Sequence, residues 1–144
     1  MNRRRLLFTS AAAPLLFGSG AARSHEYYLL GFKLIHPWAQ ASAEGDTDAP
    51  VYFRLEGVQT ADRLLRCSTP YAEQVELRAS ANPLAPALAA INIAPADTID
   101  YVADGTHLLW RGLKVPLQWG RSYMMNMVFE RAGAIGVMVS VGAI

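Results

Sequence analysis

The stretch DGTHLLWRGLKVPL, residues 104–117, carries much of the information in this sequence. Its Asp104-Gly105 pair is typical of a tight turn, and residues 107–113 have the length and composition of a β-strand. His107, one of three histidines in the chain, begins that strand. The stretch therefore predicts a turn followed by a strand whose first side chain is able to bind a metal.

The rest of the chain has the same strand pattern. Apolar and polar residues alternate around Phe32, Leu34 and His36, and again over residues 51–56. Further strand-like runs cover residues 63–68, 74–79, 91–94, 98–102, 121–130 and 135–141. Turns rich in Gly, Pro, Asn and Asp separate these runs at regular intervals, which predicts an all-β, antiparallel Greek-key β-sandwich. Residues 81–90 contain two prolines and are expected to form a loop.

Residues 1–24 have the pattern of an export signal peptide. Arg3, Arg4 and Arg5 precede a short apolar run over residues 6–17, and small residues follow at 18–24. That run is too short to span a bilayer. The three arginines fit either a twin-arginine or an ordinary secretory signal. Cleavage is expected after Ala22 or Ser24, which predicts a periplasmic protein whose mature form is one domain, residues 25–144, that does not span the membrane.

The charge of the mature chain argues against nucleic-acid binding. The whole sequence has 13 Lys and Arg against 12 Asp and Glu, but four of the arginines lie in residues 1–24. The remaining nine basic and twelve acidic side chains give a net charge of −3. No basic surface is expected for nucleic acid or an anionic membrane.

Several segments resemble the PCuAC family of periplasmic copper chaperones, which have a cupredoxin-like fold. The matching segments are HPWA at 36–39, ADRL at 61–64, STPYA at 68–72, EQVEL at 73–77, FERAG at 129–133 and the 104–117 stretch. They follow the family's order and spacing through nearly all of the mature chain. The resemblance implies a β-sandwich that binds copper and passes it to an acceptor such as the CuA subunit of cytochrome oxidase.

The copper ligands that the resemblance implies are mostly replaced. Two of the family's copper(I) ligands are the His and Met of a His-x-Met strand, which correspond to His107 and Leu109. The others are a His after the Val-Glu-Leu strand, here Arg78, and a later Met, although no methionine occurs in residues 79–106. A guanidinium stays charged and has no lone pair for a metal. Of the four positions, only His107 keeps a ligand.

Other side chains offer alternative donors for copper. Met125 and Met127 are in phase with Phe129 and are expected to fill the core rather than bind metal. If the signal is cleaved after Ser24, the imidazole and α-amine of His25 become available together. With His36 or His107 they would form a nitrogen site suited to copper(II), whereas thioether ligands would favour copper(I). His36 can alternatively act as a structural residue at a strand end.

The remaining motifs exclude most enzyme classes. The sequence has no phosphate-binding glycine loop, no His-Glu-x-x-His motif and no nucleophile with a supporting base. Cys67, the only cysteine, alternates in phase with Leu65 and is expected to be a small buried side chain. We therefore expect a protein that is not an enzyme.

Two functions remain open. The first is a copper chaperone with His107, His25 and His36 as candidate ligands. The alternative is a diverged interaction module that binds no metal, in which Arg78, Leu109 and Trp110 form a basic and apolar contact patch.

Overall fold

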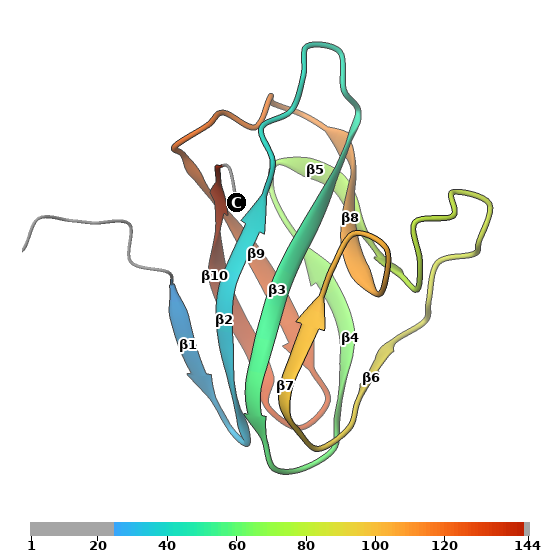
Figure 1. Cartoon of the computed structure of the whole chain (residues 1–144). Helices are drawn as coiled ribbons and strands as arrows, with labels where there is room; N and C mark the ends of the chain where they lie inside the picture. Colours follow the sequence, from blue (N-terminus) through green and yellow to red (C-terminus); the bar gives the residue numbers. More distant parts are fainter. Residues whose placement is uncertain (1–24, 143–144) are drawn as a thin grey trace, which may run out of the picture.

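The computed structural model describes residues 25–142, and every regular element among them is a strand (Figure 1). The ten strands are β1 Glu26–Leu29, β2 Phe32–Ala39, β3 Asp48–Val58, β4 Asp62–Ser68, β5 Ala72–Arg78, β6 Ile91–Ile93, β7 Ala96–Tyr101, β8 His107–Leu113, β9 Ser122–Phe129 and β10 Gly133–Val141. The all-β prediction is confirmed. Within these residues no helix exists that would be long and apolar enough to cross a membrane. The predicted signal peptide lies outside the described residues.

The strands form a barrel-like sheet in the order β5-β8-β3-β2-β10-β9-β4-β6, with β1 added to β2 and β7 added to β3. Neighbours in space are mostly not neighbours in sequence, as Greek-key crossovers require. All pairs are antiparallel except β10 with β2, which run parallel and meet at Ser140↔Trp38 and Val141↔Ala39. This parallel pair links the β2, β3, β8 and β5 side of the barrel to the β9, β4 and β6 side.

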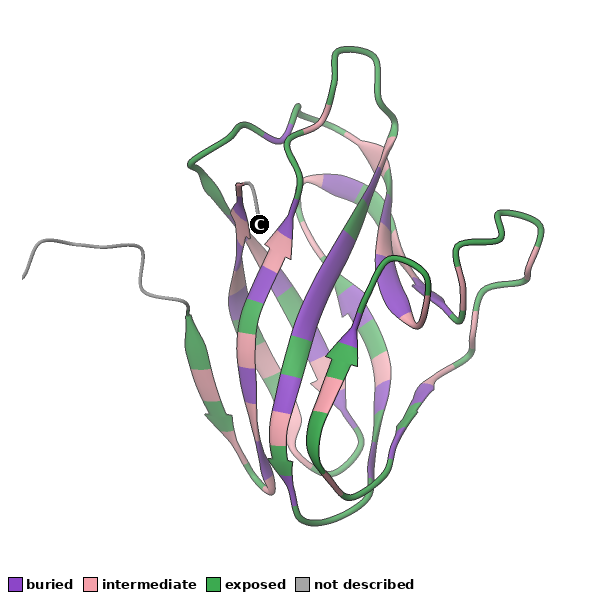
Figure 2. Ribbon diagram, in the orientation of Figure 1, coloured by how far each residue is buried: buried purple, intermediate pink, exposed green. Residues whose placement is uncertain are grey.

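The core fills the space inside the barrel. Buried and exposed residues alternate along the strands, as the purple and green bands of Figure 2 show. Met125 and Met127 are fully buried, which confirms that they pack in the core. Cys67 is also buried, and loss of solvent raises the pKa of its thiol to about 12. The prediction of an inert core cysteine is therefore confirmed.

Two strands change their pairing partner at the same level of the barrel. Along one edge of β2, the partner is β1 up to the pair Glu26↔Ile35 and β10 from Trp38 onward. Along one edge of β3, the partner is β8 at residues 48–51 and β7 at residues 53–58. The two exchanges are neighbours because Trp38 pairs with Tyr52 across β2 and β3.

Strand β1 was not predicted from the sequence. It is short and exposed on alternate residues, so it lacks the apolar alternation that marks the longer strands. A side chain helps to hold it in place, since the hydroxyl oxygen of Tyr27 accepts a hydrogen bond from the Met138 backbone amide at 2.7 Å. The hydroxyl thereby satisfies an amide on the part of β10 that β2 does not reach.

Asp62 ties the start of β4 to the turn between β9 and β10. Its Oδ1 accepts hydrogen bonds from the amides of Arg63 at 2.7 Å and Arg131 at 2.8 Å, and Oδ2 accepts one from Ala132 at 3.0 Å. The side chain is buried, so it depends on these three donors in place of water.

Replacing this carboxylate should therefore destabilise the fold. We expect Asp62→Ala to lower the free energy of unfolding by about 2–4 kcal/mol, because three backbone amides lose charge-assisted hydrogen bonds to a buried carboxylate. Chemical denaturation measures the change. The matched control is Glu130→Ala, which removes only an exposed ion pair to Arg63 and should cost under about 1 kcal/mol. Equal losses in the two variants would contradict this role of Asp62.

Candidate functional site

A row of four side chains crosses the outer face of β2, β3, β8 and β5, and consists of Trp38, Tyr52, His107 and Arg78. The ring centroids of Trp38 and Tyr52 are 4.8 Å apart, and those of Tyr52 and His107 are 5.9 Å apart. His107 is paired directly with Arg78 in the β5–β8 ladder. Paired residues on antiparallel strands project from the same face, so the four side chains form one continuous row.

His107 is held in a fixed orientation within this row. Its ring is buried, and Nδ1 donates a hydrogen bond to the carbonyl oxygen of Gly105 at 2.8 Å. That carbonyl belongs to the turn of residues 102–106, which closes by a hydrogen bond from the Val102 amide to the Thr106 carbonyl at 3.2 Å. With the proton on Nδ1, the lone pair is on Nε2. A backbone carbonyl commonly orients metal-binding histidines in this way.

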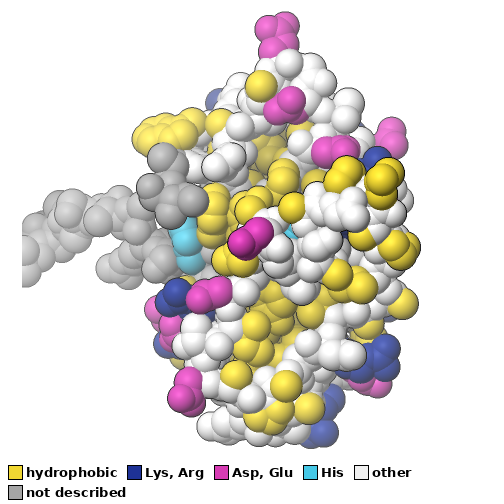
Figure 3. Space-filling model, turned by 45° about the vertical axis from the view of Figure 1, so that its right-hand side comes forward, with side chains coloured by type: hydrophobic (Ala, Val, Ile, Leu, Met, Phe, Trp, Pro, Cys, Tyr) yellow, Lys and Arg dark blue, Asp and Glu magenta, His cyan; other side chains and the backbone are white. Residues whose placement is uncertain are grey.

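The Nε2 atom of His107 keeps contact with the surface. Within residues 25–142, no fully buried side-chain nitrogen or oxygen lacks a hydrogen-bond partner. The described residues make no hydrogen bond to Nε2, so this atom is not fully buried among them. Figure 3 shows histidine surface in two places, one at the left edge and one as a small fragment near the centre, among hydrophobic side chains.

Arg78 lies at the end of β5, beside His107, and is also buried. Its Nη1 contacts Glu76 Oε2 at 3.3 Å, and Nη2 donates to the carbonyl oxygen of Asn82 at 2.9 Å. The other oxygen of Glu76 accepts from Arg111 Nη1 at 3.1 Å. Arg111 in turn lies 3.7 Å from Asp48. Two cations and two carboxylates therefore neutralise one another across β5, β8 and β3.

His36 occupies an unusual position inside β2. Its φ angle is +48°, in the left-handed region, and the β2–β3 register shifts between Ile35 and Trp38. His36 is therefore the extra residue of a β-bulge. The suggestion that it lies at a strand end is wrong, because β2 continues to Ala39. Left-handed conformations are uncommon for residues other than glycine and often mark functional positions.

The bulge brings His36 next to His25. The His36 amide donates to the His25 carbonyl oxygen at 2.8 Å, which extends the β1–β2 pairing by one step. Partial burial, and secondly the nearby charge of His25, lower the pKa of His36 below its usual value. Near neutral pH this favours the neutral imidazole, which is the form that binds metals.

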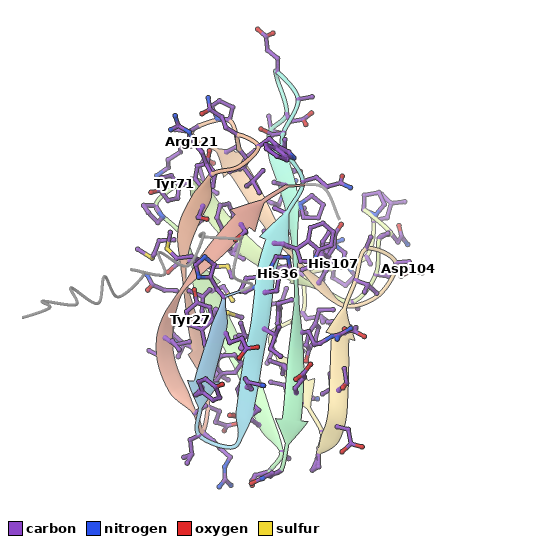
Figure 4. All side chains as sticks on the ribbon, turned by 60° about the vertical axis from the view of Figure 1, so that its left-hand side comes forward. Tyr27, His36, Tyr71, Asp104, His107 and Arg121 are labelled. Atoms are coloured by element: carbon purple, nitrogen blue, oxygen red, sulfur yellow. The ribbon has the colours of Figure 1, made fainter. Side chains whose placement is uncertain are left out.

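A shallow, mainly apolar pocket lies beside His36 on the same outer face. Arg54 and Asp100 form an ion pair at its rim, with Nε and Oδ1 2.6 Å apart. The pocket is lined by Ile35, His36, Trp38, Phe53, Arg54, Asp100, Tyr101 and Val102. Figure 4 shows His36 and His107 on the same side of the sheet. From His107 the row continues through Tyr52 to Trp38, two residues beyond His36 in β2.

Comparisons with known proteins identify the family and the fold. Residues 32–141 match the sequence model of the LpqE-like lipoproteins. The chain belongs to this family. No curated protein sequence matches this LpqE-like chain. The family description says lipoprotein, whereas the one cysteine of this chain, Cys67, is buried in β4.

Solved structures confirm the PCuAC resemblance and the fold. The apo PCuAC domain of PmoF1 is 26% identical, with a TM-score of 0.75 over 83% of this chain and 100% of that chain. The copper-bound PCuAC domain of PmoF2 is also 26% identical, with a TM-score of 0.73 over 83% and 99%. The copper(I) form of DR1885 from Deinococcus radiodurans is 19% identical, with a TM-score of 0.63 over 74% and 75%, and supports the fold alone.

Three of the positions that the resemblance assigns to copper ligands lie together on the outer face of the LpqE-like chain. Arg78, His107 and Leu109 do meet on one face, because Arg78 pairs with His107 and Glu76 with Leu109. Only His107 among the three has a donor atom for copper. In the part of the chain that the structure describes, no three His, Cys, Asp or Glu side chains form a group that could hold a metal ion. Copper(I) does not fit this face as it stands.

The contact patch predicted for the interaction module does not form, because two of its three residues are buried. Trp110 is fully buried, and its Nε1 donates to Met125 Sδ at 3.3 Å. Arg78 is buried as well, so these residues cannot offer a basic and apolar surface to a partner. The exposed tryptophan is Trp119, in the loop between β8 and β9.

The structure brings together two of the three predicted histidines. His25 and His36 are neighbours, whereas His107 lies beyond Trp38 and Tyr52. The bulge was not predicted from the sequence, although Pro37 is a signal of it. Proline inside a strand pattern often marks a bulge or an edge, because it cannot donate to the ladder.

The left-handed backbone conformation of His36 can be tested by substituting this residue. His36→Gly should change the free energy of unfolding by less than about 1 kcal/mol, since glycine adopts positive φ without strain. His36→Val should destabilise the protein by about 1–3 kcal/mol, because a β-branched residue is strained there. Thermal or chemical unfolding compares the two. Equal stability of the Gly and Val variants would show that β2 is not held in the left-handed conformation.

Proposed function

We propose that this protein is a periplasmic copper carrier that binds copper transiently through His25 and His36 and passes it to an acceptor such as the CuA subunit of cytochrome oxidase. Support comes from its family and from the copper-bound PmoF2 domain, 26% identical to it. The observation that carries the proposal is the adjacency of the two histidines, joined by the hydrogen bond from the His36 amide to the His25 carbonyl.

Export would complete this site. Cleavage after Ser24 makes His25 the first residue, so that its α-amine and imidazole are both available. The imidazole of His36 adds a third nitrogen. Three nitrogen donors suit copper(II), which prefers nitrogen and oxygen in a tetragonal arrangement. The lowered pKa of His36 also reduces the competition between protons and copper near neutral pH.

The exposure of the two histidines fits a transient carrier. His25 and His36 are both exposed, so an acceptor's ligands have direct access to an ion bound there. Transfer would proceed by ligand exchange, with one nitrogen released as each acceptor ligand binds. Neither step requires a change in the core.

His107 stays a separate predicted ligand. It offers one oriented imidazole nitrogen, but its partner across the β5–β8 pair is the positively charged Arg78. A metal ion there would have one donor and a cation close by, which is unfavourable. The proposed carrier site therefore rests on His25 and His36.

A copper titration of the mature protein tests the proposal. Protein that begins at His25 should bind one equivalent of copper(II), followed by visible absorption and by electron paramagnetic resonance of nitrogen ligands. Two residues added before His25, or the variant His36→Asn, should each weaken binding at least about tenfold, corresponding to about 1.4 kcal/mol. Asparagine is chosen because it tolerates the left-handed conformation.

The matched control is His107→Asn, which removes an imidazole from the same face and should leave copper(II) affinity unchanged. A copper(II) affinity that changes neither with the two residues added before His25 nor with His36→Asn would refute the site. Absence of copper binding in either oxidation state would refute the carrier function and leave the interaction module. Transfer itself is tested by mixing the loaded protein with a copper-free CuA domain and following the spectrum of the latter.

A further inference from the structure

We infer that Arg78 is an internal cation that substitutes for a metal ion on the β5–β8 face: it holds the segment of residues 79–90 in place and keeps metal away from His107. This role is independent of copper binding at His25 and His36, because it concerns the other end of the side-chain row.

Arg78 makes the contacts that such a role requires. Its side chain is only 7% exposed, and two different nitrogens of the guanidinium bind two different elements. Nη1 contacts Glu76 on the same strand, while Nη2 donates to the carbonyl oxygen of Asn82 in the segment that follows. A single buried cation thus joins the strand to the segment, as a metal ion with ligands from both would do.

The segment is attached to β5 at a second point. The Leu88 amide donates to the Leu77 carbonyl oxygen at 2.7 Å, and the two residues form an isolated antiparallel bridge. Residues 79–90 therefore leave β5 at Arg78, are held at Asn82, and return to the strand at Leu88. Between these points Leu84 is 90% exposed, so apolar packing does not fix the segment there.

The charges on this face balance without a metal. Arg78 and Arg111 share the carboxylate of Glu76, and Arg111 also approaches Asp48. Within this group of four side chains, the two cations match the two carboxylates, so the group has no net negative charge with which to attract a metal ion. A metal ion bound at His107 would share this face with Arg78, the cationic residue paired with His107 across β5 and β8, and the two positive charges would repel each other.

The chain offers a matched pair of variants for the first part of the inference. Arg78 and Arg111 contact the same carboxylate, but only Arg78 reaches the 79–90 segment. In Arg78→Met, Glu76 keeps Arg111 as its partner, so no carboxylate is left unpaired and the fold should persist. Arg111→Met likewise leaves Glu76 with Arg78.

Hydrogen exchange at the Leu88 amide separates the two arginines. In the protein without copper, Arg78→Met should speed exchange at Leu88 at least about tenfold, because the segment opens more often. Arg111→Met should change it less than about threefold, which would mark a local effect of Arg78 rather than a general loss of charge. Equal exchange rates in Arg78→Met and the unchanged protein would overturn the holding role.

A gain of metal binding tests the second part. The parent carries His25→Ala and His36→Asn, so that donors at the amino terminus do not contribute. In competition with a chromophoric copper(I) chelator, the parent should bind no copper(I). Adding Arg78→His and Leu109→Met should create a site for one copper(I), since imidazole and thioether donors would then surround His107. A further His107→Ala change should abolish that site.

The copper(I) measurements test the role of Arg78 separately from the proposed carrier function. Copper(I) binding by the parent that depends on His107 would show that Arg78 does not exclude metal. A folded protein with both added donors and no copper(I) binding would also overturn the inference. Neither result concerns copper(II) at His25 and His36, which the parent lacks and which is measured in the unchanged mature protein.

Discussion

The left-handed bulge at His36 is the constraint on which the remaining structure depends. Up to Ile35, strand β2 has β1 along one edge, and from Trp38 onward the same edge carries β10. One extra residue lets the strand bend between the two partners. The parallel contact with β10 then joins the two sides of the barrel. Strand β3 exchanges β8 for β7 at Tyr52, directly opposite Trp38. Both exchanges therefore place irregular backbone at one level, and the candidate residues cluster there.

The architecture does not depend on the positions that the resemblance assigns to copper ligands, because the register depends on other residues. Leu108 and Trp110 point into the core from β8 and are fully buried, and Leu77 does the same from β5. These apolar side chains fix which residues of β8 face outward. His107, Leu109 and Arg78 consequently keep their places on the outer face whether or not they bind copper. The face can change its chemistry while the fold stays the same.

Sequence reasoning predicted the features that depend on local pattern. Alternation predicted most of the strands and the burial of Met125 and Met127, and two prolines predicted the loop at residues 81–90. Features that depend on distant contacts were missed. The short strand β1 exists because β2 offers it an edge, and the β2–β10 pair joins residues about a hundred positions apart. The buried state of Trp110 follows from its phase with Leu108, yet the interaction-module hypothesis placed Trp110 in a surface contact patch.

The substitution of donors has a consequence for the kind of copper chemistry that this fold can perform. A thioether and imidazole set holds copper(I), whereas an α-amine with two imidazoles holds copper(II). Arg78 occupies one of the positions that the resemblance assigns to a copper ligand, and Glu76 and the Asn82 carbonyl bind its charge. In the proposed carrier, copper would bind instead at His25 and His36, which the bulge pairs through the hydrogen bond from the His36 amide to the His25 carbonyl oxygen. Because this site is at the surface, release to an acceptor requires no opening of the barrel.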